Sequence, residues 1–370
     1  MNKSNGKIMT ASEAVRRFIK PGTHIAFGGF TVLRRPMTIA REIARQRVGD
    51  LYVCMNGGTM AEEMLAGCGL IKWIESTYVG LEGGTPVAYA VCKSIEEGRI
   101  ELMEDYSNWS FAQRTLAGRL GLPFMPCMGD LGSDILEYDA FGKAGLRGWN
   151  ADGTPIHSGV PPKKFAVVDD PFEGYGLRPA AFNCGEDGVG NKTNAYRRGI
   201  KSTKYTGKEG VKVLLVPPIL PEVSVIRAQH VAVDGVVRIE GLVGPDFDQG
   251  LCGRSLIVEC ERICPADELR EVPERNQIAP HFVKAIVEQP FGAYPSVVPN
   301  YYDYDFPWYK RYAQLVRNKS LDELKEWWYE HLDSSDDWDY LMKRVGWKRL
   351  AELRTLPEYH FNPNLDRNAK

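Results

Sequence analysis

Two glycine pairs, each directly after an apolar run, are the residues of this chain with the clearest chemical potential. Gly28-Gly29-Phe30 follows the run His24–Phe27, and Asn56-Gly57-Gly58 follows Leu51–Met55. Glycine has no Cβ, so its backbone N–H can come close to a ligand or to another chain. In α/β proteins ligands bind beyond the carboxyl ends of the strands. We therefore expect a site lined mainly by backbone, in which few side chains do the chemistry.

The turn Asn56-Gly57-Gly58 is the better candidate for catalysis. It precedes an expected helix over Ala61–Ala66, and a helix N-terminus favours a developing negative charge. We expect the backbone amides of Asn56, Gly57 and Gly58 to act as oxyanion donors in acyl transfer. Gly28, Gly29 and Phe30 are expected to bind substrate, with a tight strand exit as the plainer alternative. The chain has neither a G-x-G-x-x-G dinucleotide fingerprint nor a Walker lysine motif.

Glu82 is a carboxylate among glycines at the end of an apolar stretch. A nucleophilic glutamate needs that kind of exposure. The alternative, which we favour, is a turn carboxylate bonded to backbone amides. Asp130, Ser133 and Asp134 stand in a second glycine-containing loop, where they either contact substrate or shape the loop.

The elements that must position these residues alternate between strands and helices. Thr10 and Glu13 form a capping box before a first helix. Further helices are expected over 37–47 and 110–120, and the expected strands include 24–27, 51–55, 71–79, 100–103, 163–168, 211–216, 223–228 and 255–260. An Asp234-Gly235 hairpin signal lies between two β-branched runs. This alternation predicts an α/β fold with an open, mostly parallel sheet flanked by helices, and a helical C-terminal tail.

The domain organisation is expected to be simple. Residues 1–319 are predicted to form one α/β domain, interrupted by an insertion at about 175–208 that has little apolar content. Residues 320–370 are predicted to form a helical extension, because leucines and tryptophans recur there at helical spacing.

Composition excludes several function classes. The 370 residues carry a net charge of −2, so a broad electrostatic grip on nucleic acid is not expected. No apolar run approaches the roughly 20 residues of a membrane span. No secretory signal is seen, so we expect a cytoplasmic protein whose eight cysteines are reduced. The spacing of Cys252, Cys260 and Cys264 fits no common zinc pattern, and no metal site is expected.

Several dispersed segments, in order, resemble the A (alpha) subunits of family I CoA-transferases of the glutaconate CoA-transferase type. The matching segments are His24–Thr31 with Arg35-Pro36, Met103–Ser107, Leu120–Pro126, Asp169–Phe172, Ala228-Gln229, Asp234–Ile239 and Tyr302–Asp305. The resemblance extends over about residues 8–355, apart from the insertion. It implies a CoA-transferase-like fold, which agrees with the element pattern.

The resemblance also implies how the work is divided. In this family the acyl-CoA thioester is attacked by a glutamate of a homologous B (beta) subunit, and no metal or bound organic cofactor is used. This chain lacks the Ser-Glu-Asn-Gly type of motif that carries that glutamate. It is therefore expected to act in a hetero-oligomer, A2B2 or A4B4, on an acyl-CoA and a small carboxylic acid. Its own contributions would be the two glycine turns, Glu82, and the loop residues Asn108, Gly132 and Ser133.

Two other functions stay open at this point. Relatives with the same architecture hydrolyse or decarboxylate CoA thioesters, and Asn108 stands where the hydrolases seem to have an acid. A non-catalytic effector-binding module is the other alternative, although the sequence has no helix-turn-helix segment. A B-like partner with an exposed glutamate would favour transfer, another residue in its place would favour the hydrolase or decarboxylase, and no partner at all would favour the effector module.

Overall fold

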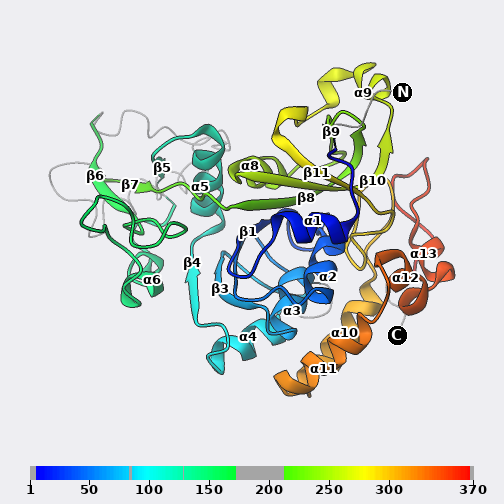
Figure 1. Cartoon of the computed structure of the whole chain (residues 1–370), viewed down its shortest axis with the longest axis horizontal. Coiled ribbons are helices and arrows are strands. Elements are labelled where there is room, and N and C mark those ends of the chain that lie inside the picture. The colour runs from blue at the N-terminus through cyan, green and yellow to red at the C-terminus, as the bar shows by residue number, and fades with distance from the viewer. Residues whose placement is uncertain (1–5, 83–85, 128, 172–211, 367–370) are drawn as a thin grey trace, which may run out of the picture. The chain divides into compact units, whose positions relative to one another are not determined.

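The computed structural model describes residues 6–82, 86–127, 129–171 and 212–366 (Figure 1). The expected insertion at 175–208 lies outside the described residues. The chain divides into two compact units, one formed by residues 1–103 with 220–370 and the other by residues 104–219. The predicted boundary between residues 319 and 320 stays a prediction.

The first unit is built on a mostly parallel sheet with strand order β11-β10-β8-β1-β2-β3-β4. The neighbouring pairs from β11 to β3 are all parallel, and β9 pairs antiparallel with β8 through the predicted Asp234-Gly235 hairpin. The strands are β1 His24–Phe27, β2 Leu51–Met55, β3 Ile71–Ser76, β4 Leu102–Asp105, β8 Val223–Ala232, β9 Val237–Arg238, β10 Ser255–Cys264 and β11 Val283–Glu288. The predicted α/β class is confirmed.

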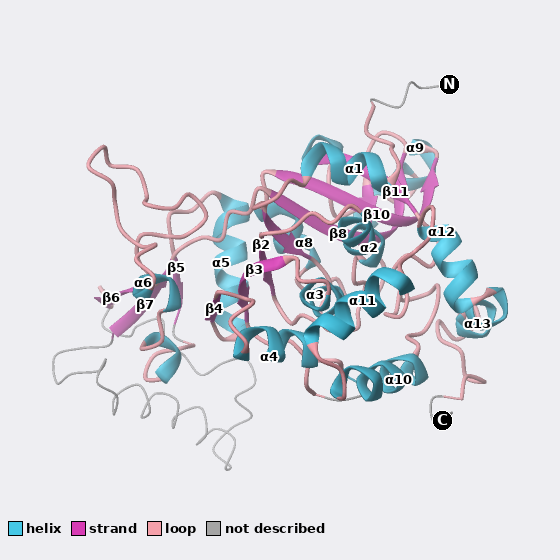
Figure 2. Ribbon diagram, turned by 60° about the horizontal axis from the view of Figure 1, so that its bottom comes forward, coloured by secondary structure: helices cyan, strands magenta, loops and turns pink. Residues whose placement is uncertain are grey.

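Both faces of this sheet are covered, as parallel sheets require. Along β8, Val225 packs into the core cluster on one face, while Ile226 packs into the cluster on the other. The helices of the first unit are α1 Ala11–Phe18, α2 Met37–Arg45, α3 Met60–Gly67, α4 Tyr89–Glu96, α8 Asp246–Cys252, α9 Ala266–Arg270, α10 Phe306–Arg317, α11 Leu321–His331, α12 Asp337–Tyr340 and α13 Trp347–Leu353. The predicted C-terminal helices are therefore present, and Figure 2 shows α11 beside α3.

The C-terminal helices are tied to the sheet layer by buried polar contacts as well as by apolar packing. Arg41 of α2 pairs with Asp337 of α12, and both side chains are buried. Trp328 of α11 is buried against Gly67 at the end of α3, where a Cβ would lie 2.8 Å from the indole ring. These contacts explain why the tail packs onto the first unit.

The second unit has its own small antiparallel sheet with strand order β5-β7-β6. Its elements are β5 Met125–Cys127, β6 Ala166–Asp169, β7 Lys212–Val216, α5 Asn108–Leu120 and α6 Ala140–Lys143. A buried cation, Lys164, pairs with the buried carboxylate of Glu104 at 2.6 Å. Its ammonium group also lies over the ring of Tyr106, which is buried.

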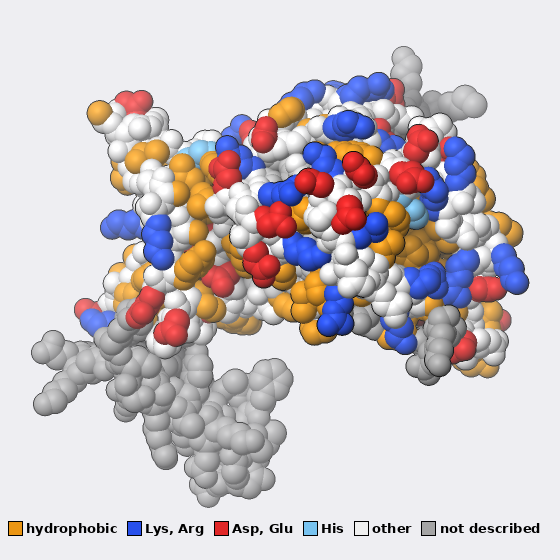
Figure 3. All heavy atoms as spheres, turned by 90° about the horizontal axis from the view of Figure 1, so that it is seen from below, with side chains coloured by type: hydrophobic (Ala, Val, Ile, Leu, Met, Phe, Trp, Pro, Cys, Tyr) orange, Lys and Arg blue, Asp and Glu red, His pale blue; other side chains and the backbone are white. Residues whose placement is uncertain are grey.

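The described part of the chain has no helix with the length and apolar content that a bilayer crossing requires. Acidic and basic side chains intermingle on the face shown in Figure 3, and neither sign dominates it. That face is consistent with the near-neutral net charge.

Candidate functional site

The structure brings the two predicted glycine turns together. The amide of Thr31 donates to the carbonyl oxygen of Gly57 at 2.8 Å, so the turn after β1 is bonded to the turn after β2. The ring of Phe30 lies against Gly57, where a Cβ would be 2.8 Å from the ring. Gly57 also has a φ of +71°, which an L-residue adopts only with strain. Glycine is therefore required here both by conformation and by space.

The amides of the second turn are engaged within the chain. The N–H of Gly57 donates to Thr77 Oγ1 at 3.2 Å, and the N–H of Gly58 donates to the carbonyl oxygen of Tyr78 at 2.7 Å. The segments after β2 and β3 therefore continue to pair beyond the regular strands. An oxyanion that used these donors would have to share or displace these two acceptors. The role of Asn56, Gly57 and Gly58 as oxyanion donors stays a prediction.

The first turn is fixed by a buried ion pair that links it to α8. Asp246 Oδ1 accepts the N–H of Gly29 at 2.6 Å, and Oδ2 accepts Nη2 of Arg34 at 2.7 Å. Both side chains are completely buried. Burial raises the pKa of Asp246, and the neighbouring Arg34 opposes that rise. Arg34 also donates to the carbonyl oxygen of Val243 at 2.9 Å, which holds the chain leading into α8.

A second buried arginine joins the two turns. The guanidinium of Arg35 donates to the carbonyl oxygens of Gly29 at 3.3 Å and Gly57 at 3.5 Å, and it forms a fully buried ion pair with Glu62. Glu62 Oε2 accepts the backbone N–H of Thr59 at 2.8 Å at the start of α3. The arrangement satisfies the turn carbonyls and the helix N-terminus together.

The next residue of α3, Glu63, has a different environment. Its carboxylate accepts the backbone N–H groups of Ala90 and Val91 at the start of α4, and the hydroxyl of Tyr312. Burial raises the pKa of Glu63 to about 7, although these hydrogen bonds and the more weakly acting Lys93 lower it. Glu62 and Glu63 thus use the same buried helix turn in two ways, one as half of an ion pair and one as an acceptor for a helix N-terminus.

Glu82 is the remaining predicted residue of the first unit. It lies in the segment after β3, is only partly buried, and has a φ of +37°. Burial raises the pKa of Tyr78, and the charge and hydrogen bond of Glu82 raise it further. Since Tyr78 also accepts the Gly58 amide through its carbonyl, Glu82 belongs to the surroundings of the second turn. Its role in binding substrate stays a prediction.

The other predicted residues lie in the second unit. Asn108 is the first residue of α5 and is exposed, and Ser107 caps that helix by accepting the N–H of Ser110. Gly132 has a φ of +83°, and Ser133 donates both its N–H and its hydroxyl to the carbonyl oxygen of Asp130. The contacts of this loop are thus internal, and a substrate role for these residues is untested.

The residues considered for metal binding are built into the core. Cys252, Cys260 and Cys264 are buried and free, and the seven cysteines that the structure describes form no disulfide. No group of three or more His, Cys, Asp or Glu residues suited to a metal ion occurs in the described ranges.

Sequence reasoning missed the two buried arginines and their partners. Arg35 entered only through the family resemblance, and Asp246 lies 212 positions from Arg34. One signal was available, because Thr59 and Glu62 have capping-box spacing at the start of α3. The arginine pair directly after an apolar turn was a second, weaker sign of buried ion pairs.

Comparisons with known proteins agree with this picture. Residues 8–289 match the family model described as Coenzyme A transferase. The A chain of glutaconate CoA-transferase from Acidaminococcus fermentans is 29% identical over 98% of this chain and 99% of the relative. The corresponding chain of 3-oxoadipate CoA-transferase from Pseudomonas knackmussii is 23% identical over 92% of this chain and 98% of that protein.

A solved structure supports the same assignment. The crystal structure of glutaconate coenzyme A-transferase from Acidaminococcus fermentans superposes with a TM-score of 0.79 at 31% identity, covering 96% of this chain and 98% of that one. The parallel sheet, the glycine turns and these similarities lead to one conclusion: the chain belongs to the coenzyme A transferase family.

Proposed function

We propose that this chain is the alpha subunit of a two-subunit CoA-transferase, which moves CoA between an acyl-CoA and a carboxylic acid. One structural observation carries the division of labour. Both carboxylates that contact the glycine turns, Glu62 and Asp246, are fully buried and paired with arginine. A buried, paired carboxylate cannot reach a thioester, so the attacking glutamate has to come from the partner. Two relatives are alpha subunits by name, which supports a beta partner.

The reaction needs no group beyond two carboxylates and CoA. In the beta subunit, the glutamate carboxylate attacks the thioester carbonyl, the CoA thiolate leaves, and an acyl-glutamyl anhydride forms. The thiolate then attacks the glutamyl carbonyl, which releases the first carboxylic acid and leaves a glutamyl-CoA thioester. The second acid repeats these two steps in reverse and leaves as its CoA thioester. Each tetrahedral intermediate carries an oxyanion that preorganised donors stabilise.

This chain contributes walls and donors to that reaction. The Asn56–Gly58 turn supplies amides toward the oxyanion, and Gly28, Gly29 and Phe30 border the substrate. Phe30 suits an edge position because it covers Gly57 while 36% of its surface stays exposed. Glu82, Asn108, Gly132 and Ser133 shape the acyl pocket. The assembly is A2B2 or A4B4 and cytoplasmic, and it binds a CoA thioester as substrate without a resident cofactor or metal.

Covalent trapping tests this proposal. The alpha and beta subunits are co-expressed and incubated with glutaconyl-CoA or 3-oxoadipyl-CoA, then treated with borohydride and mapped by mass spectrometry. Reduction of a glutamate in the beta subunit is expected, because borohydride reduces a glutamyl-CoA thioester to an alcohol. A complex carrying Glu82→Gln is the matched control, and it should still be labelled in the beta subunit. Labelling of Glu82 itself would contradict the proposal.

The same complex separates the alternative reaction. With acetate as acceptor, a transferase forms acetyl-CoA in step with the loss of the donor thioester. A hydrolase or decarboxylase consumes the donor without forming acetyl-CoA. Mass spectrometry of the CoA products distinguishes the two.

A further inference from the structure

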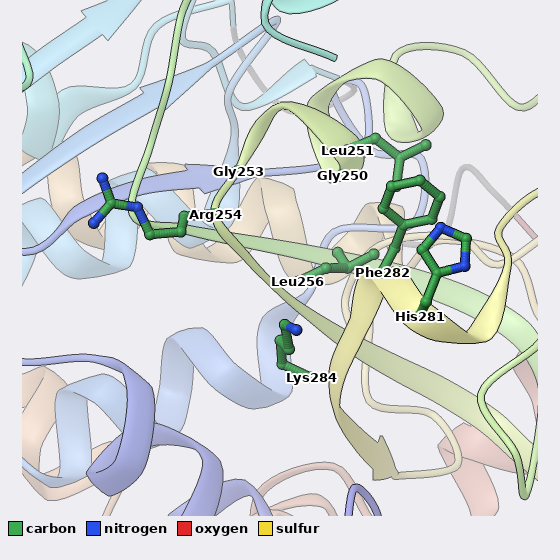
Figure 4. Close-up of a pocket in the computed structure, with 8 residues that line it drawn as sticks. All are labelled: Gly250, Leu251, Gly253, Arg254, Leu256, His281, Phe282 and Lys284. Carbon is green, nitrogen blue, oxygen red and sulfur yellow. The ribbon is translucent and has the colours of Figure 1, made fainter. Parts of the chain in front are cut away.

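A small pocket at the far end of α8 is not used by the proposed reaction. It has a volume of about 130 Å³ and is lined by Gly250, Leu251, Gly253, Arg254, Leu256, His281, Phe282 and Lys284 (Figure 4). A water molecule takes up about 30 Å³ in the liquid, and pockets for drug-sized ligands measure roughly 300–1,000 Å³. The pocket therefore suits one small group, such as a phosphate, that belongs to a ligand extending beyond it.

The polar side chains of this pocket are all basic. Arg254 directly precedes β10, Lys284 is near the start of β11, and His281 lies in the 3-10 helix Pro280–Phe282. No aspartate or glutamate is among the lining residues. Neither Arg254 nor Lys284 forms an ion pair with any residue that the structure describes, and both are exposed. A chain with a net charge of −2 thus has a local excess of positive charge here.

An aromatic surface adjoins these cations. Phe282 leaves 44% of its surface exposed, and its ring centre lies 4.0 Å from that of His281. Figure 4 shows the two rings grouped beside Leu251, with Arg254 approaching from the opposite side. Flat rings of this kind stack with nucleobases, and cations beside them bind phosphates.

Helix α8 relates the pocket to the glycine turns. Its first residue, Asp246, accepts the Gly29 amide, and its C-terminal residues Gly250 and Leu251 line the pocket. Seven helical residues span about 10 Å. A ligand whose reactive end and phosphates are separated by a long arm can therefore meet the two places at once.

We propose that this pocket binds a phosphate of an adenine nucleotide, with Lys284 and Arg254 holding the phosphate and Phe282 with His281 stacking on the base. The nucleotide end of a CoA substrate has this chemistry, so that source rests on the proposed function. A free adenine nucleotide has the same chemistry and does not.

Calorimetric titration of the alpha/beta complex with CoA and with ADP tests the site. The double variant Arg254→Ser/Lys284→Ser should weaken the binding of the nucleotide that occupies the pocket by tenfold or more. The matched control Lys348→Ser/Arg354→Ser removes two exposed cations at α13, and it should change that affinity less than twofold. Unchanged affinity in the pocket variant, an equal loss in the control, or no binding of either nucleotide to the wild-type complex would overturn the proposal.

Competition between the two probes identifies the source of the nucleotide. Displacement of ADP by CoA places the nucleotide end of CoA in the pocket, whereas ADP that still binds to the CoA-saturated complex identifies a free nucleotide. A complex that exchanges no CoA between acids, yet loses nucleotide affinity only in the pocket variant, refutes the proposed function alone. A complex that exchanges CoA normally and keeps its nucleotide affinity in the pocket variant refutes the pocket alone.

Discussion

The two ends of α8 treat positive charge in opposite ways. At its first residue, Arg34 is completely buried and paired with Asp246, and the pair holds the Gly29 amide. At the other end, Arg254 and Lys284 are exposed and have no carboxylate partner in the described structure. A buried arginine with a partner fixes backbone and removes a carboxylate from chemistry. An exposed cation without a partner remains available to a ligand.

The largest effect is expected where the pairing is tightest. Arg35→Leu leaves Glu62 buried without a cation, which should lower the free energy of unfolding by about 3–5 kcal/mol. Urea denaturation measures this loss. The double variant Arg35→Leu/Glu62→Leu is the control, and it should recover much of the stability because no charge is left alone. A single variant that loses less than about 1 kcal/mol would show that Arg35 does not act as a buried partner.

The glycine turns should be sensitive in activity rather than in folding. Gly57→Val forces a Cβ against Phe30 and into a strained φ, and it should lower the turnover of the complex by roughly 10²-fold if a donor is lost. Gly69→Val is the matched control, because Gly69 has the same φ of +71° in the turn after α3. Turnover is compared at equal amounts of folded complex. Equal losses in both variants would remove Gly57 from the site.

A pH titration sharpens the contrast between Glu62 and Glu63. The pKa of Glu63 is raised from its ordinary 4.5 to about 7, mainly by burial. The folded chain therefore keeps a proton that the unfolded chain releases, and this stabilisation, complete below pH 4.5, is lost as the pH rises toward 7. Wild type should lose stability relative to Glu63→Gln between pH 5 and 7.5. Unfolding free energies that stay parallel over this range would contradict the raised pKa.

The smallest effect is expected at the unpaired cations. Arg254→Ser/Lys284→Ser removes no ion pair and no buried contact, so the free energy of unfolding should stay within about 0.5 kcal/mol of wild type. Thermal or urea unfolding of the isolated chain measures this. A clear destabilisation would mean that these side chains support the fold, and the contrast along α8 would disappear.

The sheet could be predicted from the sequence because its strands are local. β1 and β2 coincide with the predicted runs 24–27 and 51–55, since each is a short apolar run that ends at a glycine pair. The helix after Pro36 was also predicted, with its end two residues too late. The strand predicted over 71–79 ends at Ser76, because the chain then turns to pair Tyr78 with Gly58.

The contacts that fix the site could not be predicted in the same way. The pair Arg34–Asp246 forms only because β8 lies beside β1, and strand order is not written in either local sequence. The pocket at the end of α8 likewise needs β10 and β11 to pair before Arg254 and Lys284 become neighbours. Turn chemistry is local, whereas charge pairing across strands depends on topology.

Complementation tests the central claim most directly. The alpha and beta subunits are purified separately, and the formation of acetyl-CoA from glutaconyl-CoA or 3-oxoadipyl-CoA and acetate is measured for each protein alone and for the mixture. No turnover by either protein alone and restored turnover in the mixture are predicted, because the carboxylates at the glycine turns of this chain are consumed by arginines. Full turnover by this chain alone would contradict the account.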